Sequence, residues 1–218
     1  MIPAREALAR LREGNERFVA EVRDNRAGES RRREVSAGQE PFAIILGCSD
    51  SRVPAEIVFD QGLGDLFVIR VAGNIVAPSQ VGSVEFAAER YGVRLVVVLG
   101  HSSCGAILAT VEQLSRPSEQ RSRNMHTIVA RIRPSVDALL RDDPGTDYAA
   151  LIERAVRANI RVSTDHLRHG SQILEELIDK NGLLIVGAEY SLETGKVEFF
   201  DVPDETGLYA QLPGRTRR

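Results

Sequence analysis

Cysteine is scarce in this chain, and tryptophan is absent. The two cysteines, Cys48 and Cys104, are too few for a disulfide scaffold. In a reducing compartment, paired cysteines are typical of metal or redox chemistry, although free cysteines also serve as small buried hydrophobic residues. Their number alone therefore leaves both roles open.

Long apolar runs and an excess of one charge are missing as well. No run approaches the roughly 18 residues of a membrane span, and charged residues interrupt residues 1–20, which argues against a secretory signal. The formal net charge is −3, from 28 basic and 31 acidic residues. We therefore expect neither nucleic acid nor a membrane as a partner, and a cytoplasmic location.

Apolar sequence is nevertheless sufficient for one sizeable core. Of the 218 residues, 43% are hydrophobic and 27% are charged, a composition typical of folded proteins. No internal repeat is visible. We expect one domain over residues 1–218, with an N-terminal helical arm at about residues 1–25.

Short apolar runs alternate with helical patterns along the chain. Strands are predicted at 42–47, 66–71, 95–100 and 183–188, with an antiparallel edge strand at 197–202 after a turn at 193–196. Helices are predicted at 4–22, 80–91, 105–114, 126–141 and 148–180, the last with a break near 169–170, whereas 23–38 and 115–124 look like loops. This order predicts an α/β fold with a mostly parallel β-sheet flanked by helices.

The two cysteines lie in motifs that directly follow two predicted strands. Cys-Ser-Asp-Ser-Arg occupies 48–52, and His-Ser-Ser-Cys-Gly occupies 101–105. Because the carboxyl ends of parallel strands share one edge of a sheet, we expect the motifs to converge. Two thiolates and the imidazole of His101 favour Zn²⁺. Three protein ligands leave a fourth position open, as in catalytic zinc sites.

A carboxylate and a guanidinium stand beside the first cysteine. Asp50 is suited to accept a proton from water, and Arg52 can hold that carboxylate through a planar fork. An ordinary salt bridge at the start of a helix is the alternative interpretation. Asp50 also has two possible partners, because it can ligate the metal and close the site or pair with Arg52 and leave it open.

At these motifs the chain resembles the β-class carbonic anhydrases, and the resemblance covers nearly its whole length, including residues 53–56, 66–70 and 72–74. It implies zinc-dependent, reversible hydration of carbon dioxide to bicarbonate and a proton. It also implies a homodimer or a dimer of dimers whose interface helps to form the pocket. The implied site comprises the zinc ligands Cys48, His101 and Cys104, the catalytic pair Asp50 and Arg52, and the substrate-binding residues Gln39, Phe67 and Gly105.

The chain departs from the family pattern at a few positions. Ala72 and Phe86 stand where some members carry valine and tyrosine, and Ile45 stands where one bicarbonate-regulated subgroup carries tryptophan. That form of regulation is therefore not expected. The same departure favours the open arrangement, in which Asp50 pairs with Arg52 near neutral pH.

Other functions compete with this interpretation. The same zinc scaffold would also suit hydrolysis of carbonyl sulfide or carbon disulfide. A zinc alcohol dehydrogenase needs a Gly-x-Gly-x-x-Gly motif, which the chain lacks, and a thiol-redox module prefers closely spaced cysteines. We expect His126, His166 and His169 to be surface residues. We also expect a neighbouring subunit to cover the N-terminal amphipathic helix.

Overall fold

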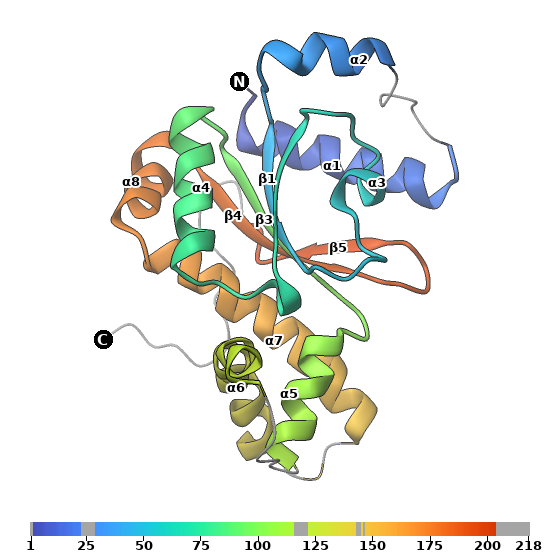
Figure 1. The fold of residues 1–218 in the computed structure, drawn as a ribbon, viewed down its shortest axis with the longest axis vertical. Helices are drawn as coiled ribbons and strands as arrows, with labels where there is room; N and C mark the ends of the chain where they lie inside the picture. The colour runs from blue at the N-terminus through green and yellow to red at the C-terminus, as the bar shows by residue number, and fades with distance from the viewer. Residues whose placement is uncertain (1, 23–28, 116–121, 143–144, 146, 204–218) are drawn as a thin grey trace.

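The structure, a computed structural model, describes residues 2–22, 29–115, 122–142, 145 and 147–203. A five-stranded sheet forms its centre, with strands β1 (Ala43–Gly47), β2 (Leu66–Arg70), β3 (Leu95–His101), β4 (Leu184–Tyr190) and β5 (Val197–Phe200). The strand order is β2-β1-β3-β4-β5; the first four strands are parallel, and β5 is antiparallel to β4. The predicted mostly parallel sheet with an antiparallel edge hairpin is therefore confirmed (Figure 1).

The burial of each strand agrees with how apolar its sequence is. Strands β1 and β3 are buried along their whole length, as expected of continuous apolar runs that are covered on both faces. Strand β2 lies at one edge of the sheet, and all of its residues after Leu66 are at least partly exposed. Its outer row of backbone N–H and C=O groups has no neighbouring strand within the described part of the chain, which leaves an edge available for pairing.

Helices cover both faces of the sheet. They are α1 (Ala4–Val19), α2 (Glu29–Glu34), α3 (Ala55–Val58), α4 (Pro78–Arg90), α5 (Gly105–Ser115), α6 (Arg123–Asp142), α7 (Tyr148–His169) and α8 (Gln172–Asn181). Helices α1 and α3 pack on one face, and α4 to α8 enclose the core on the other (Figure 1). The predicted break between α7 and α8 is confirmed, and the Ser171 hydroxyl caps α8. None of the described helices combines the length and apolarity that crossing a membrane requires.

The N-terminal helix packs on its own chain. Ala7 and Leu11 are fully buried in the core cluster shared with β1 and β3. Gly14 lies so close to α3 that an added Cβ would stand 1.9 Å from the carbonyl oxygen of Phe59. The expectation that a neighbouring subunit covers this helix is therefore wrong, because the apolar face is already buried by α3 and the sheet.

Residues 29–37, within the predicted loop at 23–38, contain more structure than their polar sequence predicts. Helix α2 is followed by a 3₁₀ helix at Val35–Ala37, so the loop prediction is wrong there. The cause is tertiary: Arg31 donates to the carbonyl oxygen of Leu63 at 3.1 Å and to the Asp65 carboxylate at 3.0 Å. Local propensity does not reveal such contacts. Residues 116–121 of the second predicted loop lie outside the described residues.

Candidate metal centre

Two neighbouring parallel strands bring the cysteine and histidine motifs together. Cys48 directly follows β1, His101 ends β3, and Gly47 is paired with Leu99 in the register of these strands. Cys104 comes after a tight turn in which Ser103 adopts φ 54°, a left-handed conformation that is uncommon outside glycine. This turn reverses the chain at the carboxyl edge of the sheet, where the two motifs were expected to converge.

The three predicted ligands form one buried cluster. The Sγ atoms of Cys48 and Cys104 and a ring nitrogen of His101 all lie within 4.8 Å of one another, and the three residues are at most 5% exposed. The Nδ1 atom of His101 lies 2.9 Å from the carbonyl oxygen of Ser102, which favours the tautomer with the proton on Nδ1. Nε2 is buried with no hydrogen-bond partner among the described residues and keeps a lone pair. Two sulfurs and a free imidazole nitrogen fit a Zn²⁺ ion.

The two thiols interact strongly with each other. The hydrogen bond from the Cys104 thiol lowers the pKa of Cys48 to about 4, although burial opposes this shift. The same contact raises the pKa of Cys104, and burial adds to the rise. One sulfur of the pair is therefore ready as a thiolate ligand. A cation bound between the two sulfurs would favour loss of the proton from the second thiol.

Asp50 and Arg52 form a bidentate ion pair beside this cluster. Arg52 Nε and Nη2 donate to the two carboxylate oxygens of Asp50 at 2.9 and 2.8 Å. These hydrogen bonds hold the pKa of Asp50 well below its usual range. Asp50 Oδ2 also lies 3.8 Å from His101 Nε2, so the carboxylate faces both Arg52 and the ligand cluster. The structure thus shows the arrangement in which Asp50 pairs with Arg52.

Arg70, at the end of β2, braces the loop that carries Cys48 and Asp50. Its Nε donates to the Cys48 carbonyl oxygen at 2.9 Å, and its Nη2 donates to the Asp50 carbonyl oxygen at 2.6 Å. A guanidinium that bonds to both carbonyl groups holds the backbone of this loop in place. The side chains of Cys48 and Asp50 are thereby directed from a fixed backbone. The sequence gives no local signal for this role, because the pairing of β1 with β2 brings Arg70 to the loop.

The three residues suggested for substrate binding are divided between two places. Gly105 adjoins Cys104, with open space where a Cβ would stand. Phe67 instead pairs with Ile44, at the far end of the strand that leads to Cys48. At about 3.3 Å per residue, four residues separate it from the ligand cluster by roughly 13 Å along the strand. Gln39, which precedes β1, donates to the Tyr91 hydroxyl at 3.0 Å, and the Tyr91 ring packs on Phe67. Gln39 and Phe67 are therefore close to each other but not to the cluster of their own chain.

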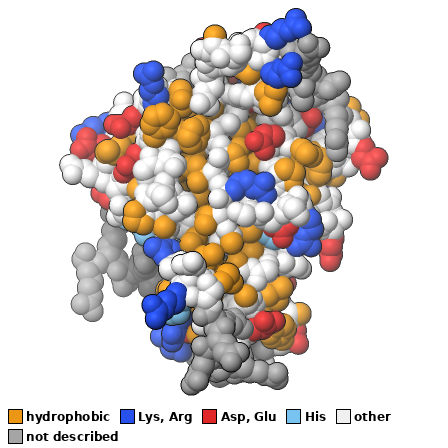
Figure 2. All heavy atoms as spheres, in the orientation of Figure 1, with side chains coloured by type: hydrophobic (Ala, Val, Ile, Leu, Met, Phe, Trp, Pro, Cys, Tyr) orange, Lys and Arg blue, Asp and Glu red, His pale blue; other side chains and the backbone are white. Residues whose placement is uncertain are grey.

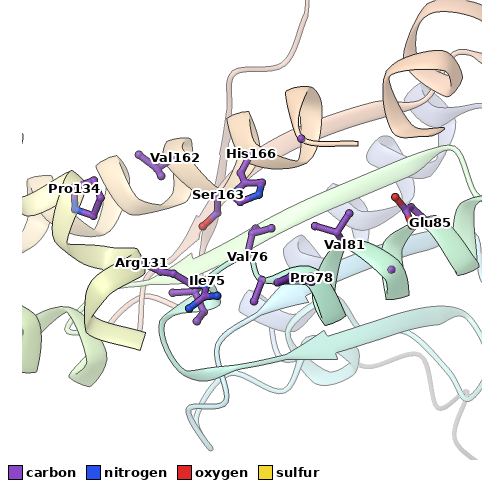
Figure 3. Close-up of a pocket in the computed structure, with 13 residues that line it drawn as sticks. Ile75, Val76, Pro78, Val81, Glu85, Arg131, Pro134, Val162, Ser163 and His166 are labelled. Atoms are coloured by element: carbon purple, nitrogen blue, oxygen red, sulfur yellow. The ribbon is translucent and has the colours of Figure 1, made fainter. Parts of the chain in front are cut away.

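A separate groove lies between α4, α6 and α7 (Figure 3). Its volume is about 580 Å³, and its walls include Ile75, Val81 and Pro134, with Arg131 and His166 among the polar lining residues. Neither Cys48 nor Asp50 lines it, so this groove is not the metal site. His126 and His169 are exposed, as expected for surface residues.

Fold and site together define an α/β protein with a candidate catalytic metal centre at the carboxyl edge of a parallel sheet. The sequence profile of the carbonic anhydrase family matches residues 43–197, which include every ligand of this centre. The chain belongs to the β-class carbonic anhydrase family, whose members are lyases with carbon dioxide hydration as their general reaction.

Named relatives agree with this assignment. The chain is 40% identical over 201 residues to carbonic anhydrase 2 of Mycobacterium tuberculosis, covering 88% of this chain and 90% of that protein. It is 38% identical over 189 residues to the carbonic anhydrase of Mycolicibacterium smegmatis, covering 86% and 89%. The solved β-carbonic anhydrase CcaA aligns with a TM-score of 0.72 at 25% identity, covering 89% of this chain and 95% of that chain.

Proposed function

We propose that this protein catalyses the zinc-dependent, reversible hydration of carbon dioxide to bicarbonate and a proton. The observation that carries the proposal is the buried Cys48, His101 and Cys104 cluster with the Asp50 carboxylate beside it. Three ligands are the number that catalytic zinc sites use. The names of the relatives favour carbon dioxide over its sulfur analogues, and no feature of the described site favours carbonyl sulfide or carbon disulfide.

The residues of the site have separate tasks. Cys48, His101 and Cys104 would hold a zinc ion, and the ion would act as a Lewis acid that lowers the pKa of water. Arg52 keeps Asp50 ionised, so the carboxylate accepts hydrogen bonds at neutral pH. A carboxylate whose pKa is held this low does not retain a proton. Asp50 therefore orients the attacking water and passes the released proton toward solvent. Gly105 leaves room for a small substrate beside Cys104.

Measuring the metal content and the carbon dioxide hydration rate of the purified protein tests the proposal. We expect about one zinc ion per chain, as the single three-ligand cluster in the described residues implies. We also expect hydration, followed by stopped flow with a pH indicator, to be far faster than in buffer. The rate should fall when a chelator removes zinc and return when zinc is added. Zinc-loaded protein that hydrates carbon dioxide no faster than buffer would refute the proposed function.

Self-association would place the missing substrate residues at the metal centre. Strand β2 is an open edge within the described sheet, and closed two-fold dimers are the commonest protein assembly. If two copies pair antiparallel along β2, the Phe67 end of one copy lies beside the Arg70 end of the other. Arg70 is bonded to the loop that carries Cys48, so Phe67 and Gln39 of one copy would approach the metal centre of its partner. The fungal proteins of one similar structure, from Sordaria macrospora, are described as tetrameric.

An aromatic patch next to this edge suits such a contact. We use this name for Phe67, Phe86 and Tyr91, whose ring centroids lie 5.7–6.2 Å apart. Phe86 is 51% exposed, which is high for a large apolar side chain. Figure 2 shows hydrophobic side chains gathered over α4, which carries Phe86, and across the middle of this face. Burying the patch in a dimer would remove it from water.

Phe86→Asp should therefore weaken self-association and lower activity together. A charge in the middle of an apolar contact loses its hydration and has no partner there. Light scattering at micromolar concentration should give a dimer or a larger assembly for the parent protein and a smaller species for the variant. Met125→Asp is the control, because Met125 is 43% exposed on α6, away from β2. A fully active monomer of Phe86→Asp would contradict the shared pocket.

A further inference from the structure

The turn that follows β2 touches the metal centre through its backbone. The Gly73 N–H donates to Cys48 Sγ at 3.3 Å. Gly73 adopts φ 71° and the next residue, Asn74, φ 42°, so two consecutive residues are in the left-handed region. A Cβ on Gly73 would stand 2.8 Å from a methyl group of Ile132 and 3.0 Å from the Ala106 side chain. Glycine is therefore required for this close approach.

Helix α7 holds the same turn from the opposite side. Asn159 Nδ2 donates to the Gly73 carbonyl oxygen at 2.8 Å, and the Ser163 hydroxyl donates to the Asn74 carbonyl oxygen at 3.0 Å. Asn159 and Ser163 are four positions apart, on one face of the helix, and both are at least 96% buried. In Figure 3, Ser163 points from α7 toward the chain segment of Ile75 and Val76 that continues from this turn.

The buried amide side chain of Asn159 lowers the stability of the fold unless it forms hydrogen bonds. The flanking α7 residues Val156 and Ile160 belong to the apolar core cluster. A buried amide without a hydrogen bond would destabilise the fold, whereas a leucine would fill such a position without that cost. Gly73 is thus held through both of its backbone polar groups: Asn159 on α7 donates to its carbonyl oxygen, and its N–H, in the preceding peptide group, donates to Cys48 Sγ.

We propose that Asn159 is a positioning residue for the metal centre, acting on the Cys48 sulfur through the backbone of Gly73. The inference rests on the proposed zinc function. A thiolate that accepts an N–H hydrogen bond is held in one orientation and donates less of its negative charge to a bound cation. This matters in a site with two thiolates, whose combined charge neutralises a dication and weakens its acidifying effect on water. Asn159 itself touches neither the ligand atoms nor the substrate.

Two substitutions test this role in the full-length, zinc-loaded protein. Asn159→Ala removes the donor, and Asn159→Asp keeps the size but turns an oxygen toward the Gly73 carbonyl group. Zinc affinity, measured by competition with a chromogenic chelator, should fall about 10- to 100-fold in both variants. In cobalt(II)-substituted protein, the sulfur-to-cobalt charge-transfer band should also shift, because Cys48 loses its hydrogen bond or its orientation.

A matched control separates positioning from a general effect on the helix. Thr164 is buried on α7 as well, but its hydroxyl donates only to the Ile160 carbonyl oxygen of its own helix. Thr164→Val should therefore leave zinc affinity within about twofold of the parent value, since no bond to the turn changes. An equal loss in Thr164→Val and Asn159→Ala, with circular dichroism unchanged, would overturn the positioning role.

The outcomes also distinguish this inference from the proposed function. If the parent protein binds no zinc, or shows no sulfur-to-cobalt band, the proposed metal centre itself has failed. If the parent binds zinc with that band, and both Asn159 variants match it in affinity and spectrum, only the role of Asn159 is refuted. Ser163→Ala, which releases the neighbouring carbonyl of the same turn, gives a second route to the answer if Asn159→Asp does not fold.

Discussion

We expect the Cys104→Ser protein to lose its zinc and, with it, its carbon dioxide hydration. Serine keeps the size of the side chain but offers a hydroxyl, which is a poor ligand beside one thiolate and one imidazole. Cys48→Ser and His101→Ala should have the same effect, because each removes one of only three ligands. Elemental analysis after gel filtration, combined with stopped-flow hydration, measures both consequences on the same sample.

His169→Ala is the matched control for the histidine variant. This residue is exposed at the end of α7, and its Nδ1 atom lies 3.0 Å from the Asp165 carbonyl oxygen of the same helix. Zinc content and activity should therefore stay at parent levels. Full zinc occupancy in all three ligand variants would show that the assignment of Cys48, His101 and Cys104 is wrong.

Arg52→Ala should lower turnover by at least about 100-fold while zinc remains bound, which is the range that a proton-transfer group contributes. Arg52 holds both oxygens of Asp50, and it is the main cause of the low pKa of that carboxyl. Asp50 Oδ2 lies 3.8 Å from His101 Nε2, beside the cluster. Without the guanidinium, this oxygen has lost its partner. The carboxylate can then bind the metal and block its open position. Asp50→Asn should also retain zinc and lose activity, because an amide cannot accept the proton.

An exposed ion pair elsewhere provides the control for Arg52. Arg133 and Asp137 form an i,i+4 pair on α6 at 2.9 Å, and Arg133→Ala should leave turnover unchanged. The distinguishing measurements are the turnover number and the zinc content of each variant. Turnover near the parent value in Arg52→Ala would remove the Asp50–Arg52 pair from the mechanism and leave it as an ordinary salt bridge.

The strands could be predicted from sequence because each is a short run of buried apolar residues. The run at 95–100 became β3, which is buried on both faces, and the motif that follows it fell at the expected edge. The short helices α2 and α3 could not be predicted. Six and four residues carry too little periodicity, and α2 depends on Arg31 reaching Leu63 and Asp65.

The metal centre shows the same division between local and distant information. The clustering of Cys48, His101 and Cys104 was predictable because their motifs lie where β1 and β3 end, and parallel strands end at one edge of a sheet. The contacts of Arg70 and Asn159 were not predictable, since they donate to backbone carbonyl groups 22 and 86 positions away in sequence. The resemblance placed Gln39 and Phe67 near the substrate, but one chain does not bring them to its own cluster. That part of the site stays a prediction about an assembly.

X-ray diffraction recorded on both sides of the zinc absorption edge tests the central claim most directly. At neutral pH the anomalous difference map should contain one strong peak per chain, bonded to the sulfurs of Cys48 and Cys104 and to His101 Nε2. Asp50 should remain on Arg52 and leave the fourth position to solvent. A map with no peak at these three side chains, in a protein that hydrates carbon dioxide, would contradict the account.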